Sequence, residues 1–149
     1  MTYQDVRSKF EALTKTALMG SGTDLHKIDE ANIFFDNFGE TPPGPDVSYA
    51  TISLSFTDTA QDVVGCEGME TLQGSLLVNV YTPKQTASVP GETICLRVMK
   101  EWLKLGSYAE TLGLAQACVR NINGPNTLAP DARPHHVNNI SGRWTARVA

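Results

Sequence analysis

The sequence predicts an α+β fold, in which two main helices pack on one face of a mostly antiparallel sheet of about four to five strands. Two segments repeat apolar residues at helical spacing, one at the N-terminus and one after residue 88. Two further segments alternate apolar and polar residues, which is typical of strands with one buried face. The expected order is helix, weak strand, two strands, helix and two strands, and this order favours helices gathered on one side of the sheet.

The first helix is expected to run from Thr2 to about Met19. Thr2 followed by Asp5 forms a weak capping-box start. One stripe of this segment carries its apolar residues, which are Tyr3, Val6, Phe10, Leu13 and Ala17. Gly20 and Gly22 are expected to end the helix, because glycine adopts the left-handed conformation that follows a last turn.

A polar connection covers residues 20–31, and a short strand is expected at residues 32–35. Residues 36–46 contain three prolines, which fix φ and remove backbone donors. This segment is therefore expected to form an extended arm or a long loop. An arm of this kind is suited to wrapping around a neighbouring molecule.

Two strands with one buried face each are expected at residues 49–56 and 72–81. In the first strand the apolar face carries Ala50, Ile52, Leu54 and Phe56. The opposite faces of both strands carry mainly Ser, Thr, Asn and Gln, and are expected to meet water or a neighbouring subunit. Two successive strands of this kind favour an antiparallel pair, joined by a loop at residues 58–70. Pro83 is expected to end the second strand because it cannot donate to the ladder.

The second helix has a candidate N-cap at Ser88, with Pro90 and Glu92 suited to its first turn. Its apolar stripe consists of Ile94, Val98, Trp102 and Leu105, widened by Cys95, Met99 and Leu103. Gly106 is expected to end the helix. Two more strands are expected at about residues 114–122 and 136–148, with loop signals between them at 123–126 and 129–131.

Length and composition indicate one domain over residues 1–149, with 41% hydrophobic and 19% charged residues. The formal net charge of -4 argues against a domain that binds duplex DNA, which normally carries a basic patch. The three cysteines include no Cys-x-x-Cys pair, so zinc-ribbon and thioredoxin-type sites are excluded by spacing. We expect reduced thiols in an intracellular protein, with neither a signal peptide nor an apolar run of the roughly 20 residues that span a bilayer.

No catalytic motif emerges from the sequence. His135 and His136 are adjacent, so on a strand they point to opposite faces, and an exposed pair at a loop end is expected rather than a metal site. Cys95 and Cys118 lie in apolar surroundings and are expected to be small core residues. Cys66 is the thiol most suited to exposure, but the adjacent Glu67 would raise its pKa rather than activate it.

Several segments, in order, resemble the tail terminator (tail completion) proteins of long-tailed bacteriophages. The resemblance starts with the amphipathic helix at residues 3–13 and continues through Phe35-Asp36-Asn37-Phe38 and the prolines into the strand at residues 49–56. It then covers the strand Gly74-Ser-Leu-Leu-Val-Asn-Val-Tyr-Thr-Pro83, the helix to Trp102, and a closing strand with Gly142-Arg143-Trp144.

The resemblance implies a structural virion protein that forms a ring, typically hexameric, in the tail or neck after assembly in the host cytoplasm. Such a ring caps the tail tube, ends its polymerisation and offers a docking surface for the head connector. Genome DNA would pass through the lumen without being read, and an acidic protein suits that passage because a basic lumen would retain phosphate. The implied partners are further copies of the chain, the tube protein and the connector or stopper protein; no enzyme activity, cofactor or metal is implied.

The candidate residues for contacts with a subunit or partner lie on the arm, the loop at 58–70 and the strand faces and ends. They are Phe38, Glu40, Asp62, Val63, Val64, Tyr81, Lys84, Arg143, Trp144 and Arg147. Two other functions stay open at this point. One is a different neck, head–tail joining or minor tail protein, and the other is a small cytosolic enzyme that uses Cys66 or the histidine pair.

Overall fold

The computed structural model describes residues 3–35, 43–61, 70–84, 89–108, 116–127 and 135–148. These residues form two α-helices, one short 3-10 helix and five strands. In chain order the elements are α1 (Tyr3–Met19), η1 (Glu30–Asn32), β1 (Ile33–Phe35), β2 (Tyr49–Gln61), β3 (Glu70–Pro83), α2 (Val89–Tyr108), β4 (Gln116–Thr127) and β5 (His135–Val148).

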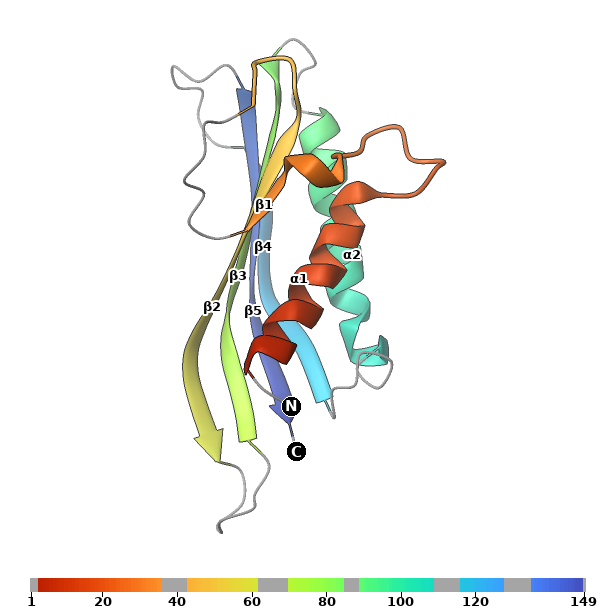
Figure 1. Cartoon of the computed structure of the whole chain (residues 1–149). Helices are drawn as coiled ribbons and strands as arrows, with labels where there is room; N and C mark the ends of the chain where they lie inside the picture. The colour runs from red at the N-terminus through yellow and green to blue at the C-terminus, as the bar shows by residue number, and fades with distance from the viewer. Residues whose placement is uncertain are drawn as a thin grey trace.

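The five strands form one sheet in the order β1-β2-β3-β5-β4. The short β1 runs parallel to β2, and all other neighbours are antiparallel. Both α1 and α2 lie on the same side of this sheet, and no helix of the described residues lies on its other side (Figure 1). The prediction of an α+β fold with helices on one face is therefore confirmed.

The core lies between the helices and the sheet. The alternating strands supply apolar side chains from the face that meets the helices, as the sequence predicted for residues 49–56 and 72–80. From α2 the buried stripe is Ile94, Cys95, Val98 and Trp102. Leu103 is 64% exposed, so its expected place on this stripe was wrong. Burial of these side chains provides the main driving force that holds the helices against the sheet.

The strands are longer than the sequence predicted. β2 continues to Gln61 and β3 starts at Glu70, although loop composition was expected between residues 58 and 70. The pairing continues because a register shift between Phe56 and Asp58 lets the ladder resume beyond it. The apolar alternation that identifies a strand ends at Phe56, and this explains why the extension was missed.

Two further boundaries differ from the expectation. β4 runs through residues 123–126 to Thr127, where the sequence indicated a loop. This strand forms the edge of the sheet and has register shifts on both sides of Asn123, so it tolerates Pro125, which cannot donate to a ladder. α2 passes through Gly106 and ends at Tyr108, because a glycine weakens a helix interior without forbidding it.

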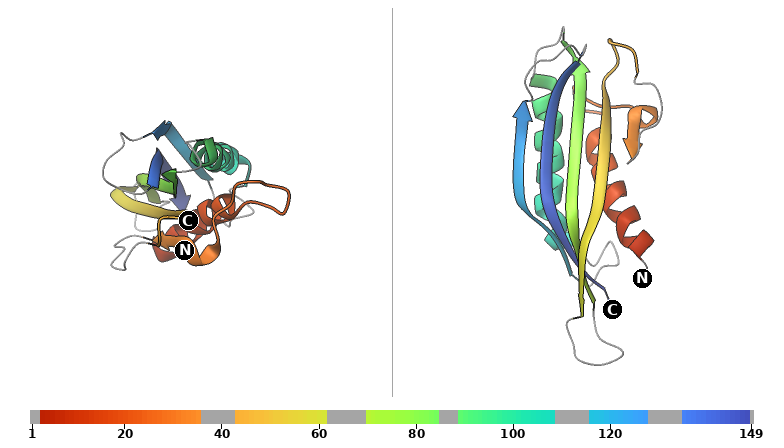
Figure 2. Two further views of the ribbon diagram at one scale, coloured as in Figure 1. Left: turned by 90° about the horizontal axis from the view of Figure 1, so that it is seen from above. Right: turned by 90° about the vertical axis from the view of Figure 1, so that its left-hand side faces the viewer.

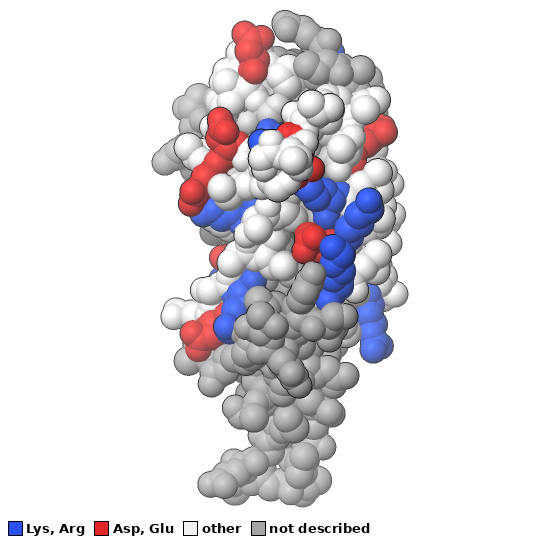
Figure 3. Space-filling model, turned by 90° about the vertical axis from the view of Figure 1, so that its right-hand side faces the viewer, with Lys and Arg blue, Asp and Glu red and all other residues white. Residues whose placement is uncertain are grey.

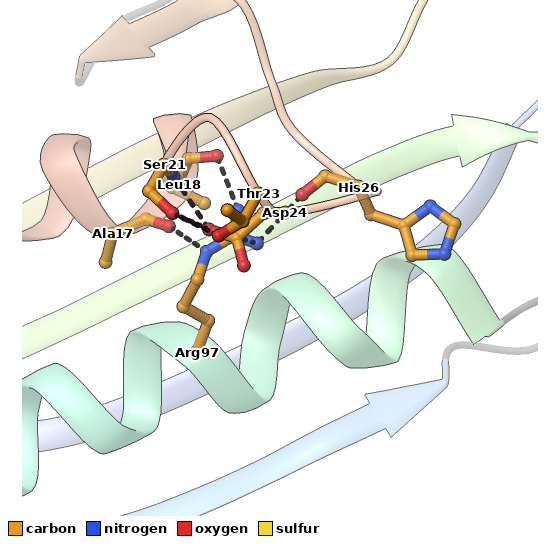
Figure 4. A network of polar contacts seen from close by, with 7 residues as sticks. All are labelled: Ala17, Leu18, Ser21, Thr23, Asp24, His26 and Arg97. Carbon is orange, nitrogen blue, oxygen red and sulfur yellow. Dashed lines mark hydrogen bonds and ion pairs between the residues drawn. The ribbon is translucent and has the colours of Figure 1, made fainter.

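One arginine on α2 fixes the end of α1 (Figure 4). Arg97 Nε donates to the Ala17 carbonyl at 2.5 Å, and its two terminal nitrogens donate to the carbonyls of His26 at 2.8 Å and Leu18 at 3.0 Å. The same guanidinium lies 3.8 Å from the Asp24 carboxylate. Because the last carbonyls of a helix lack partners and carry partial negative charge, a planar cation with several donors suits this position.

The turn after α1 places the Asp24 carboxylate next to Arg97. Gly20 adopts φ +67, the left-handed conformation predicted for the helix end. Ser21 then donates its backbone N–H to Asp24 Oδ2 at 2.7 Å and its hydroxyl to the same oxygen at 3.1 Å. The backbone hydrogen bond from Ser21 is the main cause that lowers the pKa of Asp24, and Arg97 lowers it further.

Replacing Arg97 by methionine is expected to lower the free energy of unfolding by about 2–3 kcal/mol, because the carbonyls of Ala17 and His26 lose the guanidinium donors while the aliphatic stem is kept. Arg97→Lys should lower the free energy of unfolding by less than Arg97→Met, because it keeps the charge. It should still cost some stability, because lysine lacks the planar set of donors of the guanidinium. Urea unfolding measures both values. The exposed Lys100 on the same helix provides the control, and an equal loss in Lys100→Met would contradict this role for Arg97.

Candidate functional site

The sheet surface opposite the helices is the candidate functional surface, and we call it the open face. It faces the viewer in the right-hand view of Figure 2, with both helices behind the strands. Its exposed side chains in the middle of β2, β3 and β5 are Ser53, Ser55, Thr57, Ser75, Leu77 and Arg143. No element among the described ranges covers the central strands on this face, so it is a surface available to a partner.

Leu77 is the apolar member of this group. Its side chain is 37% exposed, and its direct neighbours across the ladders are Ser53 on β2 and Ser141 on β5. A leucine surrounded by short polar side chains gives the centre of the open face a small apolar contact point. Ser55 and Ser75 lie beside it and share a hydrogen bond of 2.7 Å between their hydroxyls.

Near the start of β2, an aromatic cluster of Tyr49, Tyr81 and His135 lies on the open face. Tyr49 and Tyr81 stack with ring centroids 4.3 Å apart and planes 3° apart, and His135 meets Tyr49 edge-on at 5.1 Å. His135 Nε2 also lies 2.9 Å from the Val47 carbonyl, and the residue is only 5% exposed. His135 was expected to be exposed, and this was wrong, because the stacked tyrosines and residue 47 cover its ring.

A polar hollow of about 460 Å³ lies beside the exposed serines of the open face. Its lining comes from four strands and consists of Thr57, Gln73, Gly74, Ser75, Arg120, Asn121, Arg143, Trp144 and Thr145. Two of these side chains are cationic. Arg120 on β4 and Arg143 on β5 are direct partners in the ladder, and both are exposed. Like charges in this position repel each other and destabilise the pair unless an anion lies between them.

Gly74 is required by the geometry beside this hollow. A Cβ at Gly74 would lie 1.7 Å from the Ser55 carbonyl oxygen and 2.9 Å from Trp144 Nε1. The first distance is a collision with backbone, next to the register shift of β2. Any larger residue would therefore displace strand β2, and glycine is the residue that fits this close approach.

Trp144 was predicted to contact a partner, but the structure places it in the core. Its side chain is 0% exposed and packs against Phe10 of α1 at 5.1 Å and Phe56 of β2 at 5.0 Å between ring centroids. The ring is enclosed because Trp144 alternates with Arg143 and points to the helix side of β5. Its Nε1 finds no acceptor among the described residues.

The other predicted contact residues are distributed as follows. Tyr81 is half-buried in the aromatic cluster, and Lys84 is exposed just beyond β3, where its carbonyl lies 3.2 Å from His136 Nε2. Arg143 lies on the open face, and Arg147 pairs with Thr71 and Gln116 near the end of β5. Five predictions fall outside the described residues, namely Phe38, Glu40, Asp62, Val63 and Val64.

The side of the molecule that carries the helices differs from the open face in its charges. Figure 3 shows Lys and Arg interspersed with Asp and Glu over its described part. Many of these charges neutralise each other in ion pairs on or next to the helices: Arg7–Glu11, Lys15–Glu30, Arg97–Asp24 and Lys104–Glu101. Among the described residues, Arg120 and Arg143 take part in no such pair.

The described residues offer little for catalysis by thiols or metals. Cys95 is fully buried, and burial raises the pKa of its thiol to about 12, so it stays protonated, in agreement with its predicted core position. Cys118 is half-buried on β4. Within the described ranges no three His, Cys, Asp or Glu residues come together in a way that could hold a metal ion.

The contact residues predicted from the sequence did not include Leu77 or Arg120, which the structure places exposed on the open face. The signal for Leu77 was present, because it is an apolar residue on the otherwise polar face of a strand with regular alternation. The pairing of Arg120 with Arg143 could not be predicted from the sequence, since it depends on the register between β4 and β5.

No helix in the described part of the chain is long and apolar enough to cross a membrane. The sequence matches no protein-family model and no curated protein.

Proposed function

We propose that this protein is a structural component of a bacteriophage tail, a terminator whose copies form a ring on the tail tube. The ring ends polymerisation of the tube and gives the head connector a surface on which to dock. One face of the ring would imitate the docking surface of a tube subunit, while the other would not accept a further tube subunit. The resemblance of the ordered segments to tail terminator proteins motivates this proposal.

The observation that carries the proposal is the open face. A single sheet with helices on one side exposes Ser, Thr and Arg side chains around Leu77 on its other side. Leu77 gives the centre of this face an apolar side chain whose burial would favour a subunit interface. The edge strand β4 and the uncovered stretch of β2 beyond β1 offer further surface for neighbouring copies.

The direct test mixes the purified chain with polymerising tube protein and measures tube lengths by electron microscopy. Tubes are expected to become shorter and more uniform as the chain is added. Native mass spectrometry should detect a closed oligomer, alone or on the tube. Unaltered tube growth at a molar excess of the chain would contradict the proposal.

Leu77→Asp is expected to weaken this capping by about tenfold or more in the concentration required, because it places a charge in the centre of the proposed contact. Leu103→Asp is the matched control, since Leu103 is 64% exposed and lies on α2, on the other side of the sheet. Both variants should fold, because both side chains are accessible to water. Equal loss of capping in the two variants would show that the open face has no special role.

A further inference from the structure

The charged residues that form no ion pair within the described part of the chain include Lys9, Lys27 and Lys100, and two further groups that lie apart in the fold. Arg120 and Arg143 lie on β4 and β5, at one edge of the strand order, and form no ion pair or hydrogen bond among the described residues. Asp29 and Asp46 are exposed and likewise unpaired within the described part of the chain. They lie shortly before β1 and β2, at the opposite edge of the sheet.

We propose that the two arginines bind carboxylates of a second copy of this chain, supplied by Asp29 and Asp46 at its β1 edge. This inference rests on the proposed ring and names the contact that would join neighbouring copies. A guanidinium pair suits carboxylates because each group can donate two parallel hydrogen bonds. The hollow of about 460 Å³ beside the arginines has room for side chains from a neighbour.

The arrangement of the arginines supports an external anion. Arg120 and Arg143 are direct cross-strand partners, and among the described residues no acid compensates their repulsion. In the helix layer, by contrast, four ion pairs neutralise eight charged residues within the chain, while Lys9 and Lys100 form no ion pair among the described residues. Lys27 lines the same hollow as Asp46 but forms no ion pair with it, so that carboxylate is also left for another partner.

The placement of the two groups at opposite edges determines the kind of assembly. A contact between different surfaces of identical chains is heterologous, and repetition of such a contact closes into a ring when the rotation between copies permits it. A second copy is favoured over nucleic acid as the occupant, because the formal net charge of -4 opposes phosphate binding by the chain as a whole. The site is incomplete without the second copy.

The test is a double-mutant cycle on the full chain, with assembly followed by native mass spectrometry and light scattering. Arg120→Gln/Arg143→Gln and Asp29→Asn/Asp46→Asn should each raise the concentration for half-assembly by about tenfold or more. The combination of all four changes should be little worse than either pair, because the two pairs remove the same contacts. Lys9→Gln/Lys100→Gln is the control with the same charge change as the arginine variant, placed on the helix layer.

A thermal melt of each unassembled variant distinguishes loss of the contact between copies from loss of folding stability. The arginine variant should melt at the same or a slightly higher temperature, because a like-charge pair has been removed. Normal assembly of both variants, or fully additive effects in the cycle, would overturn this inference and leave the ring itself intact. A wild-type chain that stays monomeric and does not alter tube growth would overturn the ring as well. Loss of duplex DNA binding in the arginine variant, with unchanged assembly, would assign the site to nucleic acid instead.

Discussion

Replacing Trp144 by alanine is expected to lower the free energy of unfolding by about 3–5 kcal/mol, which is enough to unfold a large fraction of a marginally stable domain. The indole is fully enclosed between Phe10 of α1 and Phe56 of β2, so its removal leaves a cavity where the helix layer meets the sheet. Urea unfolding at low protein concentration measures the loss without a contribution from assembly.

The neighbouring arginine provides the control for this prediction. Arg143→Ala should change the free energy of unfolding by less than about 0.5 kcal/mol, because the side chain is exposed on the opposite face of β5. If Trp144→Ala left stability unchanged and reduced only assembly, Trp144 would have to be a contact residue, as the sequence first indicated. Comparison of the two variants therefore distinguishes a core residue from a surface residue at adjacent positions of β5.

The layers of the fold could be predicted because periodicity reports which side of an element is buried. Alternation at residues 49–56 and the stripe from Ile94 to Trp102 were sufficient to place the helices on one face. Strand ends could not be predicted, since β2 continues past Phe56 on backbone hydrogen bonds that need no apolar side chain. Gly106 and Pro125 also indicated local boundaries that tertiary pairing and packing overrode.

The candidate surface was predictable only in part. The polar alternation of β2 and β3 correctly indicated a face without a core partner. Arg143 was predicted only as a contact residue, and the register of β5 with β3 puts it on this face. The error at Trp144 arose because its flanking arginines indicated a surface, although strict alternation sends the middle residue to the other side. Contacts set by register between distant strands, such as Arg120 with Arg143, are not encoded in any local pattern.

The helix layer and the open face differ in the interactions that their residues make. The helix layer holds the sheet through a dry core and through hydrogen bonds such as those of Arg97, and four ion pairs neutralise part of its charge. The open face has few such internal connections and keeps Leu77 and two arginines exposed. Substitutions in the first group should act on folding, whereas substitutions in the second should act on association.

Trp102→Ala is expected to lower the free energy of unfolding by about 3–5 kcal/mol, since this side chain is 1% exposed in the middle of the core. Its Nε1 donates to Thr14 Oγ1 at 3.0 Å, and that hydroxyl donates to the Phe10 carbonyl at 2.9 Å, so α2 is joined to α1 by a buried hydrogen bond.

Phenylalanine substitutions isolate this hydrogen bond from the volume of the ring. Trp102→Phe should cost more than Trp144→Phe by about 0.5–1.5 kcal/mol, because the first removes a satisfied donor and the second removes one without an acceptor. In a cycle with Thr14→Val, the coupling between Thr14 and Trp102 should be of the same size. A coupling near zero in urea unfolding would show that this hydrogen bond does not join the helices, and would leave apolar packing and the Arg97 contacts as their connection.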